Sequence, residues 1–196
     1  MPVRPANSKN PLEKIILGID PGTVVLGYGV IKQEGQKLTA IQLGVVKLDK
    51  YKSHEIRLAK IYEKVTQLIN EFLPDEMAIE SPFLGKNIQS TLKLGRAQGI
   101  AMAAAIARQI PIVEYAPRKV KLSVTGSGNA SKEQVQYMVR TLLNIEETPD
   151  FYDATDALAV AICHSYQIAS LAGKGGTKKA SSWKEFIENN PERVKK

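Results

Sequence analysis

Two kinds of hydrophobic pattern alternate along the chain, and together they predict an α/β protein. Short apolar runs bounded by turn residues are typical of buried strands, and they occupy residues 14–20, 24–31, 38–48, 77–80 and 112–115. Apolar residues spaced three or four apart predict helices at 54–72, 88–108, 118–125, 132–143 and 153–169. Ser131 and Gln134 form a capping-box pattern at the start of the fourth helix.

The lengths of the connections predict how the strands pair. The first three strands follow one another through short links, which favours an antiparallel meander. The strand at 77–80 comes after a helix, so we expect it to lie parallel to the first strand. Gly27 and Gly29 leave the second strand with little side chain, which suits either a bend or the close approach of a ligand backbone.

The helix at 88–108 carries Gly95, Gly99 and Ala103 four residues apart on one face. Small residues allow another backbone to come close. Either a helix contact within the chain or a dimer interface would use this face, and the sequence does not choose between them.

Composition bounds the domain organisation of the 196 residues. We expect one domain over 14–171, a flexible leader over 1–13 and a basic, flexible tail over 172–196. No apolar run approaches the roughly 18 residues that a membrane span needs. The chain has one cysteine, Cys163, which excludes an internal disulfide, so we expect a cytoplasmic protein without a membrane partner.

Positive charge is concentrated in one part of the chain. Residues 81–132 hold eight Lys or Arg against the single acid Glu114, which accounts for a local charge equal to the net charge of +7 for the whole chain. Such segregation suits a nucleic-acid surface beside an acidic site, although a charged stretch can also be only a solvated face.

Four acids stand out by their positions. Asp20 and Glu80 end predicted strands, and Asp153 and Asp156 lie three residues apart in the first turn of an apolar helix. Parallel neighbouring strands would bring Asp20 and Glu80 together. Clustered carboxylates favour Mg²⁺ or Mn²⁺, and two such ions about 4 Å apart support phosphodiester hydrolysis. Taken singly, Asp20 could be a turn residue and the helix pair could complement the helix dipole.

Four segments resemble the RuvC family of Holliday-junction resolvases. They are GIDPGTVVLGYGVI at 18–31, AIESPFLGKN at 78–87, EYAPRKVKLSVTGSGNASKEQVQYMV at 114–139 and DATDALAVAICH at 153–164. The resemblance implies a ribonuclease H-like three-layer α/β fold with a five-stranded mixed sheet flanked by helices. It also implies a homodimer that nicks two strands of four-way junction DNA with Mg²⁺, in recombination and repair, together with the RuvA and RuvB branch-migration proteins.

Residue roles follow from the resemblance by position. The catalytic, metal-binding carboxylates correspond to Asp20, Glu80, Asp153 and Asp156, with two ions expected per active site. Some relatives place a histidine where this chain has Asp153. The aromatic residue that family members insert into the junction corresponds to Phe83, which could otherwise be a core residue.

The important basic positions of the family correspond to Lys121 and Lys132. Further candidates for DNA binding, any of which could be merely solvated, are Lys86, Arg118 and Lys119. His164 shares a helical face with Asp156, and it is either catalytic or a packed histidine.

Three other functions compete with junction cleavage. The DPGT turn also resembles a phosphate loop of actin-like ATPases, but those enzymes need two such domains and this chain has length for one. A non-catalytic junction-binding module and an RNA-processing nuclease of the same fold are the remaining alternatives.

Overall fold

The computed structural model describes residues 13–82, 87–146 and 152–173. Its strands are β1 (Glu13–Asp20), β2 (Val25–Glu34), β3 (Lys37–Lys47), β4 (Glu76–Glu80) and β5 (Ile112–Tyr115). Its helices are α1 (His54–Phe72), α2 (Ile88–Ile106), α3 (Pro117–Thr125), α4 (Lys132–Leu143) and α5 (Tyr152–Gly173). All ten elements predicted from the hydrophobic pattern are present, and α5 continues beyond the predicted end at residue 169.

Local capping explains where several helices begin. The Ser53 side chain accepts a hydrogen bond from the Ile56 amide, and Asn87 does the same for Ser90. The predicted capping box is confirmed, because Ser131 and Gln134 bond reciprocally at the start of α4. These bonds satisfy amides that the first turn of a helix leaves without partners.

The five strands form one mixed sheet in the order β3-β2-β1-β4-β5. The meander of β1, β2 and β3 is antiparallel, whereas β4 pairs with both β1 and β5 in parallel. Ile19 lies opposite Ile79, so the next residues, Asp20 and Glu80, end neighbouring strands at the same edge of the sheet. This arrangement was predicted from the connections alone.

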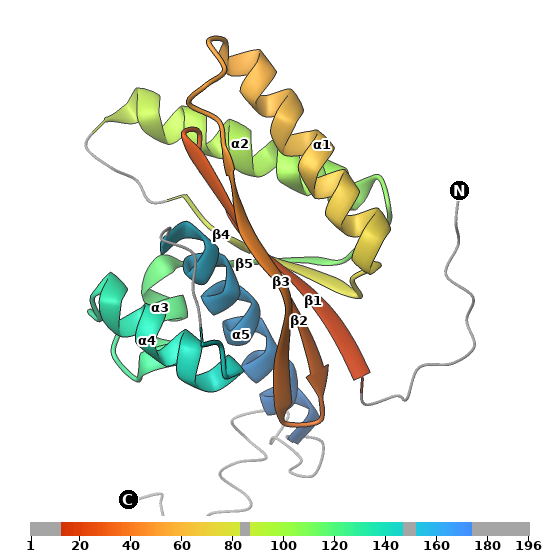
Figure 1. Ribbon diagram of the computed structural model, residues 1–196, viewed down its shortest axis with the longest axis vertical. Helices are drawn as coiled ribbons and strands as arrows, with labels where there is room; N and C mark the ends of the chain where they lie inside the picture. Colours follow the sequence, from red (N-terminus) through yellow and green to blue (C-terminus); the bar gives the residue numbers. More distant parts are fainter. Residues whose placement is uncertain (1–12, 83–86, 147–151, 174–196) are drawn as a thin grey trace, which may run out of the picture.

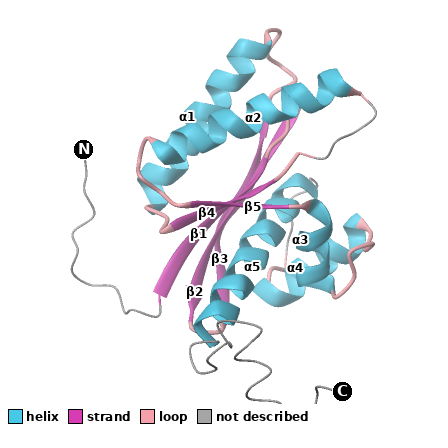
Figure 2. Cartoon of the chain, turned by 180° about the vertical axis from the view of Figure 1, so that it is seen from behind, coloured by secondary structure: helices cyan, strands magenta, loops and turns pink. Residues whose placement is uncertain are grey.

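Helices cover both faces of the sheet and produce three layers. Figures 1 and 2 show α1 and α2 on one side, and α3, α4 and α5 on the other. Two buried apolar clusters fill the spaces between the layers, one around Leu17, Ile61 and Ile79 and the other around Ile16, Leu158 and Val139. The fold is therefore the expected three-layer, ribonuclease H-like α/β arrangement.

Glycines in β1 and β2 allow α5 to lie unusually close to the sheet. A Cβ atom added at Gly18 would lie 2.1 Å from the carbonyl oxygen of Ala157, and one at Gly27 would lie 1.9 Å from that of Asp153. Neither contact is physically possible. Gly27 was predicted to serve a bend or a ligand, but the backbone that approaches it is that of α5.

None of the helices in the described ranges is both long and apolar enough to cross a membrane.

Candidate active site

Three of the four predicted carboxylates surround one cavity. Asp20 from β1, Glu80 from β4 and Asp156 from α5 line a hollow of about 260 Å³. Lys121 from α3 and Lys132 from α4 also line it. Side chains from five elements therefore meet at the carboxyl ends of β1 and β4.

Asp153 lies beside this cavity without forming part of its lining. Its negative charge nevertheless acts on Asp20, Asp156 and Lys132, which places it in the same electrostatic cluster. The close approach of its backbone to Gly27 fixes this first turn of α5 against β2. The structure thus brings all four predicted acids into one region, with Asp153 at its margin.

Burial and mutual repulsion make the carboxylates hard to ionise. Burial raises the pKa of Asp20 well above its ordinary value, and the charges of Glu80, Asp156 and Asp153 raise it further. Burial and the charge of Asp156 raise the pKa of Glu80 to about 7. Burial also raises the pKa of Asp156, although Lys132 opposes that effect. The cluster therefore has more negative charge than its neighbouring side chains neutralise.

The two cavity lysines are held in different ways. Lys132 Nζ lies 3.2 Å from Asp156 Oδ2, and its side chain is 58% exposed, so it can also reach a bound anion. Lys121 Nζ donates a hydrogen bond of 2.8 Å to the Ala130 carbonyl. Both positive charges lower the pKa of Glu80 and so favour its ionised form.

The weaker basic candidates lie outside the cavity lining. Lys119 Nζ donates to Gln167 Oε1 at 2.7 Å and sits 5.0 Å from the centre of the Tyr115 ring, so it links α3 to α5. Arg118 is exposed on α3, where its side chain lies near Gly128. Phe83 and Lys86 lie outside the described residues.

The donor chemistry of the cavity fits a hard divalent cation. Carboxylate oxygens are the ligands that Mg²⁺ and Mn²⁺ prefer, and a cation would neutralise the crowded acids. Across residues 13–82, 87–146 and 152–173, no three His, Cys, Asp or Glu side chains are already placed to hold one ion together. Mg²⁺ does not require such a cage, since it commonly keeps several waters and uses one or two carboxylates plus substrate phosphate.

Sequence reasoning missed two groups that support the site. Arg57 of α1 donates to the carbonyls of Thr23 at 3.1 Å and Tyr51 at 2.8 Å, which ties the turn after Asp20 to α1. No sequence signal marks this arginine. Glu76 begins β4, four residues before Glu80. Because side chains alternate along a strand, the two acids lie on the same face of the sheet, and this spacing could have indicated Glu76 from the sequence.

Comparison with known proteins identifies the family. The model of the family described as crossover junction endodeoxyribonuclease RuvC matches residues 16–164. The chain belongs to the RuvC family. The RuvC of Cytophaga hutchinsonii is 57% identical over 96% of this chain and 92% of its own length, and that of Porphyromonas gingivalis is 51% identical over 95% and 100%.

Solved RuvC structures share this fold. A structure of Thermus thermophilus RuvC in complex with Holliday junction substrate superposes with a TM-score of 0.75 at 32% identity, covering 80% of this chain and 96% of that one. A Thermus thermophilus RuvC structure described without a substrate gives a TM-score of 0.72 at 33% identity over the same shares. The RuvC resemblance inferred from the four sequence segments is therefore confirmed.

The raised pKa of Glu80 predicts a pH-dependent stability that Mg²⁺ alters. Between its ordinary value of 4.5 and about 7, the folded protein retains a proton that the unfolded chain has lost. The free energy of unfolding of the metal-free protein should therefore fall as the pH rises through this window. Because Mg²⁺ favours ionised carboxylates, the gain in melting temperature on adding Mg²⁺ should be a few °C larger at about pH 8.5 than at about pH 6.

Differential scanning fluorimetry with and without Mg²⁺ at the two pH values measures this effect. Glu80→Gln, which keeps the side-chain size but cannot titrate, is the matched control and should show a weaker pH dependence in the metal-free protein. An equal Mg²⁺ effect at both pH values would contradict the prediction.

Proposed function

We propose that Asp20, Glu80, Asp153 and Asp156 form the active site with which this RuvC-family endonuclease cuts four-way DNA junctions. The chain is a Holliday-junction resolvase of recombination and repair, as its family shows. The observation that carries the residue assignment is the convergence of Asp20, Glu80 and Asp156 on one cavity beside two lysines. Their raised pKa values add a reason for the cluster to bind a cation.

The RuvC family is one of metal-dependent nucleases. We assign the metal as Mg²⁺, replaceable by Mn²⁺, with two ions per site. When bound, such ions activate water and stabilise the leaving oxygen of the phosphodiester. Asp20 is the central ligand, since the charges of the other three acids all act on it.

Residues beside the carboxylates hold them in place and supply positive charge to the cavity. Lys132 holds Asp156 in place and, being largely exposed, can also bind the scissile phosphate. Lys121 is fixed by the Ala130 carbonyl at the cavity wall, where its charge favours the ionised form of Glu80. Pro117, Val120, Val135 and Ala159 give the same cavity an apolar wall, which limits water around the carboxylates.

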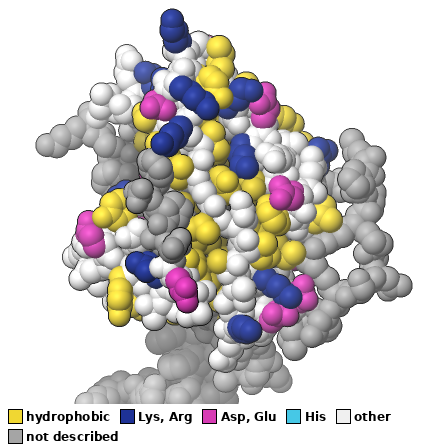
Figure 3. Space-filling view, in the orientation of Figure 1, with side chains coloured by type: hydrophobic (Ala, Val, Ile, Leu, Met, Phe, Trp, Pro, Cys, Tyr) yellow, Lys and Arg dark blue, Asp and Glu magenta, His cyan; other side chains and the backbone are white. Residues whose placement is uncertain are grey.

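Junction DNA would reach this cavity across the basic surface predicted from residues 81–132. We assign DNA contact to Lys121 and Lys132 first, then to Phe83, Lys86, Arg118 and Lys119. Lys and Arg side chains also gather over the upper part of the face seen in Figure 3, where the chain passes from β3 into α1. Phosphate contacts of this kind bind DNA without reading its sequence.

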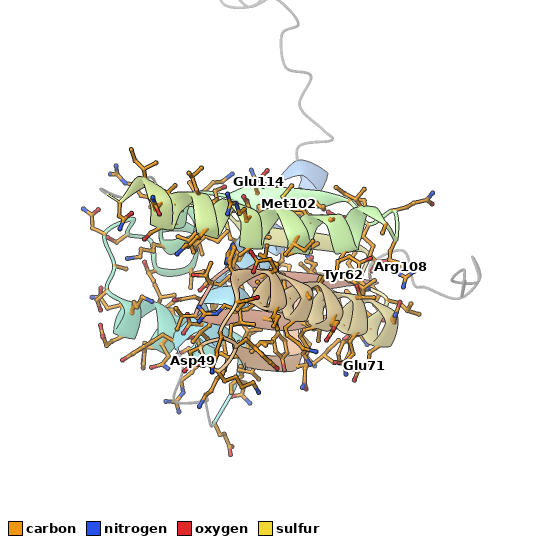
Figure 4. All side chains as sticks on the ribbon, turned by 90° about the horizontal axis from the view of Figure 1, so that it is seen from above. Asp49, Tyr62, Glu71, Met102, Arg108 and Glu114 are labelled. Atoms are coloured by element: carbon orange, nitrogen blue, oxygen red, sulfur yellow. The ribbon has the colours of Figure 1, made fainter. Side chains whose placement is uncertain are left out.

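A homodimer would use the outer face of α2. Ile88 is 74% exposed, Leu92 57% and Ile106 63%, and Gly95 and Gly99 fall between them on the same side of the helix. Apart from the adjoining backbone of α2 itself, no described atom lies within 4 Å of a Cβ added at either glycine, so the alternative of a close contact with another element is not observed at these two positions. In Figure 4, α2 and α1 lie side by side on the surface facing the viewer.

This exposed face suits a second copy of the chain. Two α2 helices could approach closely through their glycines and bury the flanking isoleucine and leucine side chains. A dimer would present two active sites, as paired nicking of a four-way junction requires. From the family resemblance we also propose that RuvA and RuvB are partners and that the protein works in the cytoplasm.

Asp20→Asn should abolish cleavage and leave junction binding intact. The amide keeps the shape of the carboxylate but removes the negative charge needed for the metal, so nicking should fall at least about 10³-fold. The assay is Mg²⁺-dependent nicking of a labelled synthetic four-way junction, with gel-shift binding measured in Ca²⁺. Wild-type cleavage rates in this variant would contradict the assignment of Asp20.

The same assay separates the competing functions. Glu71→Gln, a change at an exposed acid near the end of α1, is the control and should cut at the wild-type rate. Binding without any Mg²⁺-dependent nicking by the wild type would indicate a non-catalytic module. Preferential cleavage of structured RNA would indicate an RNA-processing nuclease, and ATP hydrolysis would support the ATPase alternative.

Gly99→Glu should convert the dimer into a monomer. The new side chain would place a charge in the middle of the α2 face, while the loss of glycine should favour the helix itself. Light scattering after size-exclusion chromatography should give half of the wild-type mass. Gln89→Glu, an exposed change on another side of α2, should remain dimeric, and a dimeric Gly99→Glu protein would contradict this interface.

A further inference from the structure

A chain of polar side chains, buried at Tyr115 and His164, joins four elements outside the lining of the carboxylate cavity. His164 of α5 is 3% exposed, and its Nδ1 lies 2.7 Å from the Tyr115 hydroxyl of β5. Its Nε2 lies 2.7 Å from Glu76 Oε2 of β4. Glu76 Oε1 in turn forms an ion pair with Lys14 of β1. None of these four residues lines the cavity.

With Glu76 ionised and the His164 ring neutral, each hydrogen bond has only one possible direction. An ionised Glu76 can only accept, so the Nε2–H of His164 donates to it. Nδ1 of the neutral ring is then an acceptor, and the Tyr115 hydroxyl donates to it. Burial lowers the pKa of His164, which is consistent with a neutral ring. The single carboxylate charge is balanced by Lys14.

Every element that carries one of the proposed active-site carboxylates contributes a residue to this chain of polar side chains. Lys14 lies on β1, six residues before Asp20, and Glu76 lies on β4, four residues before Glu80. Tyr115 pairs in register with Glu80, and the Ser81 amide donates to the Tyr115 carbonyl at 2.9 Å. The polar chain therefore connects the strands that end in the site.

His164 adds α5 to these strands. It follows Asp156 by eight residues, or about 12 Å along the helix axis. Both of its ring nitrogens are occupied by Tyr115 and Glu76, so it has no free nitrogen for the reaction. This geometry excludes the catalytic alternative that the sequence left open for His164.

Two different contacts then determine where α5 lies. The glycines of β1 and β2 set how near the helix comes to the sheet and, through Asp153, hold the first turn of α5 against β2. The bonds of His164 are directional, and a shift of α5 along its axis would leave buried polar groups without partners. His164 therefore adds a directional constraint on the axial position of α5, eight residues beyond Asp156.

We propose that His164 is a positioning residue: by bridging Tyr115 and Glu76, it fixes the axial position of α5 together with the glycine contacts of β1 and β2, and thereby places Asp153 and Asp156 against Asp20 and Glu80. The inference rests on the proposed role of these carboxylates in binding metal. It predicts that loss of the polar chain weakens metal binding at a distance while the DNA-contacting lysines remain in place.

Two variants test this role by removing one or both of the hydrogen bonds of His164. Tyr115→Phe removes only the hydroxyl that bonds His164, and His164→Leu removes both bonds while remaining apolar. Ile61→Val is the matched control, because Ile61 is buried in the other core cluster and lies on α1. All measurements are made well below the lowest melting temperature of the set.

Mn²⁺ binding, followed by the electron paramagnetic resonance signal of free Mn²⁺, is the primary measurement. The dissociation constant should rise about 3- to 10-fold in Tyr115→Phe and further in His164→Leu, at or below the effect typical of groups that support metal ligands. Ile61→Val should bind Mn²⁺ as the wild type does, and junction binding in Ca²⁺ should change less than about twofold in all three variants.

The outcome separates positioning from simple stabilisation. Lower melting temperatures in Tyr115→Phe and His164→Leu, with Mn²⁺ affinity equal to that of the wild type, would overturn the inference. If His164→Leu does not fold, Tyr115→Phe alone decides. A wild type that binds Mn²⁺ through Asp20 but does not nick junctions would overturn the proposed function, and the Mn²⁺ comparison would still test His164.

Discussion

The close approach of α5 to the sheet is the constraint on which the proposed active site depends. Gly18 and Gly27 have no side chains, and the backbone of α5 occupies the space where their Cβ atoms would be. Only this approach allows acids on the first turn of a helix to meet acids at two strand ends. Any larger residue at these glycines would separate the two halves of the carboxylate cluster.

The cluster is unfavourable for the metal-free protein, and the rest of the fold compensates for it. Asp20, Glu80 and Asp156 all have raised pKa values because burial and mutual repulsion disfavour their charges. Apolar layers on both faces of the sheet hold the acids together despite this repulsion. A bound cation would relieve this repulsion, which is the physical reason for proposing a metal at these carboxylates.

The sequence was sufficient to predict the elements, the strand directions and the meeting of Asp20 with Glu80. The spacing of apolar residues and the lengths of the links between elements determine these features, and both are visible in short stretches of the sequence. The sequence could not predict that α5 approaches Gly27 or that His164 bridges Tyr115 and Glu76, because those contacts join residues far apart in the chain. Asp153 was expected to lie with the other acids; its charge acts on Asp20 and Asp156, but it does not line the cavity that they line.

The central claim is that a metal site is assembled from β1, β4 and α5 around Asp20. Anomalous X-ray diffraction from crystals grown with Mn²⁺ and a four-way junction tests it most directly. The account predicts two Mn²⁺ peaks, about 4 Å apart, among the carboxylates of Asp20, Glu80, Asp153 and Asp156. Mn²⁺ bound elsewhere, or no anomalous signal between these carboxylates, would contradict the account.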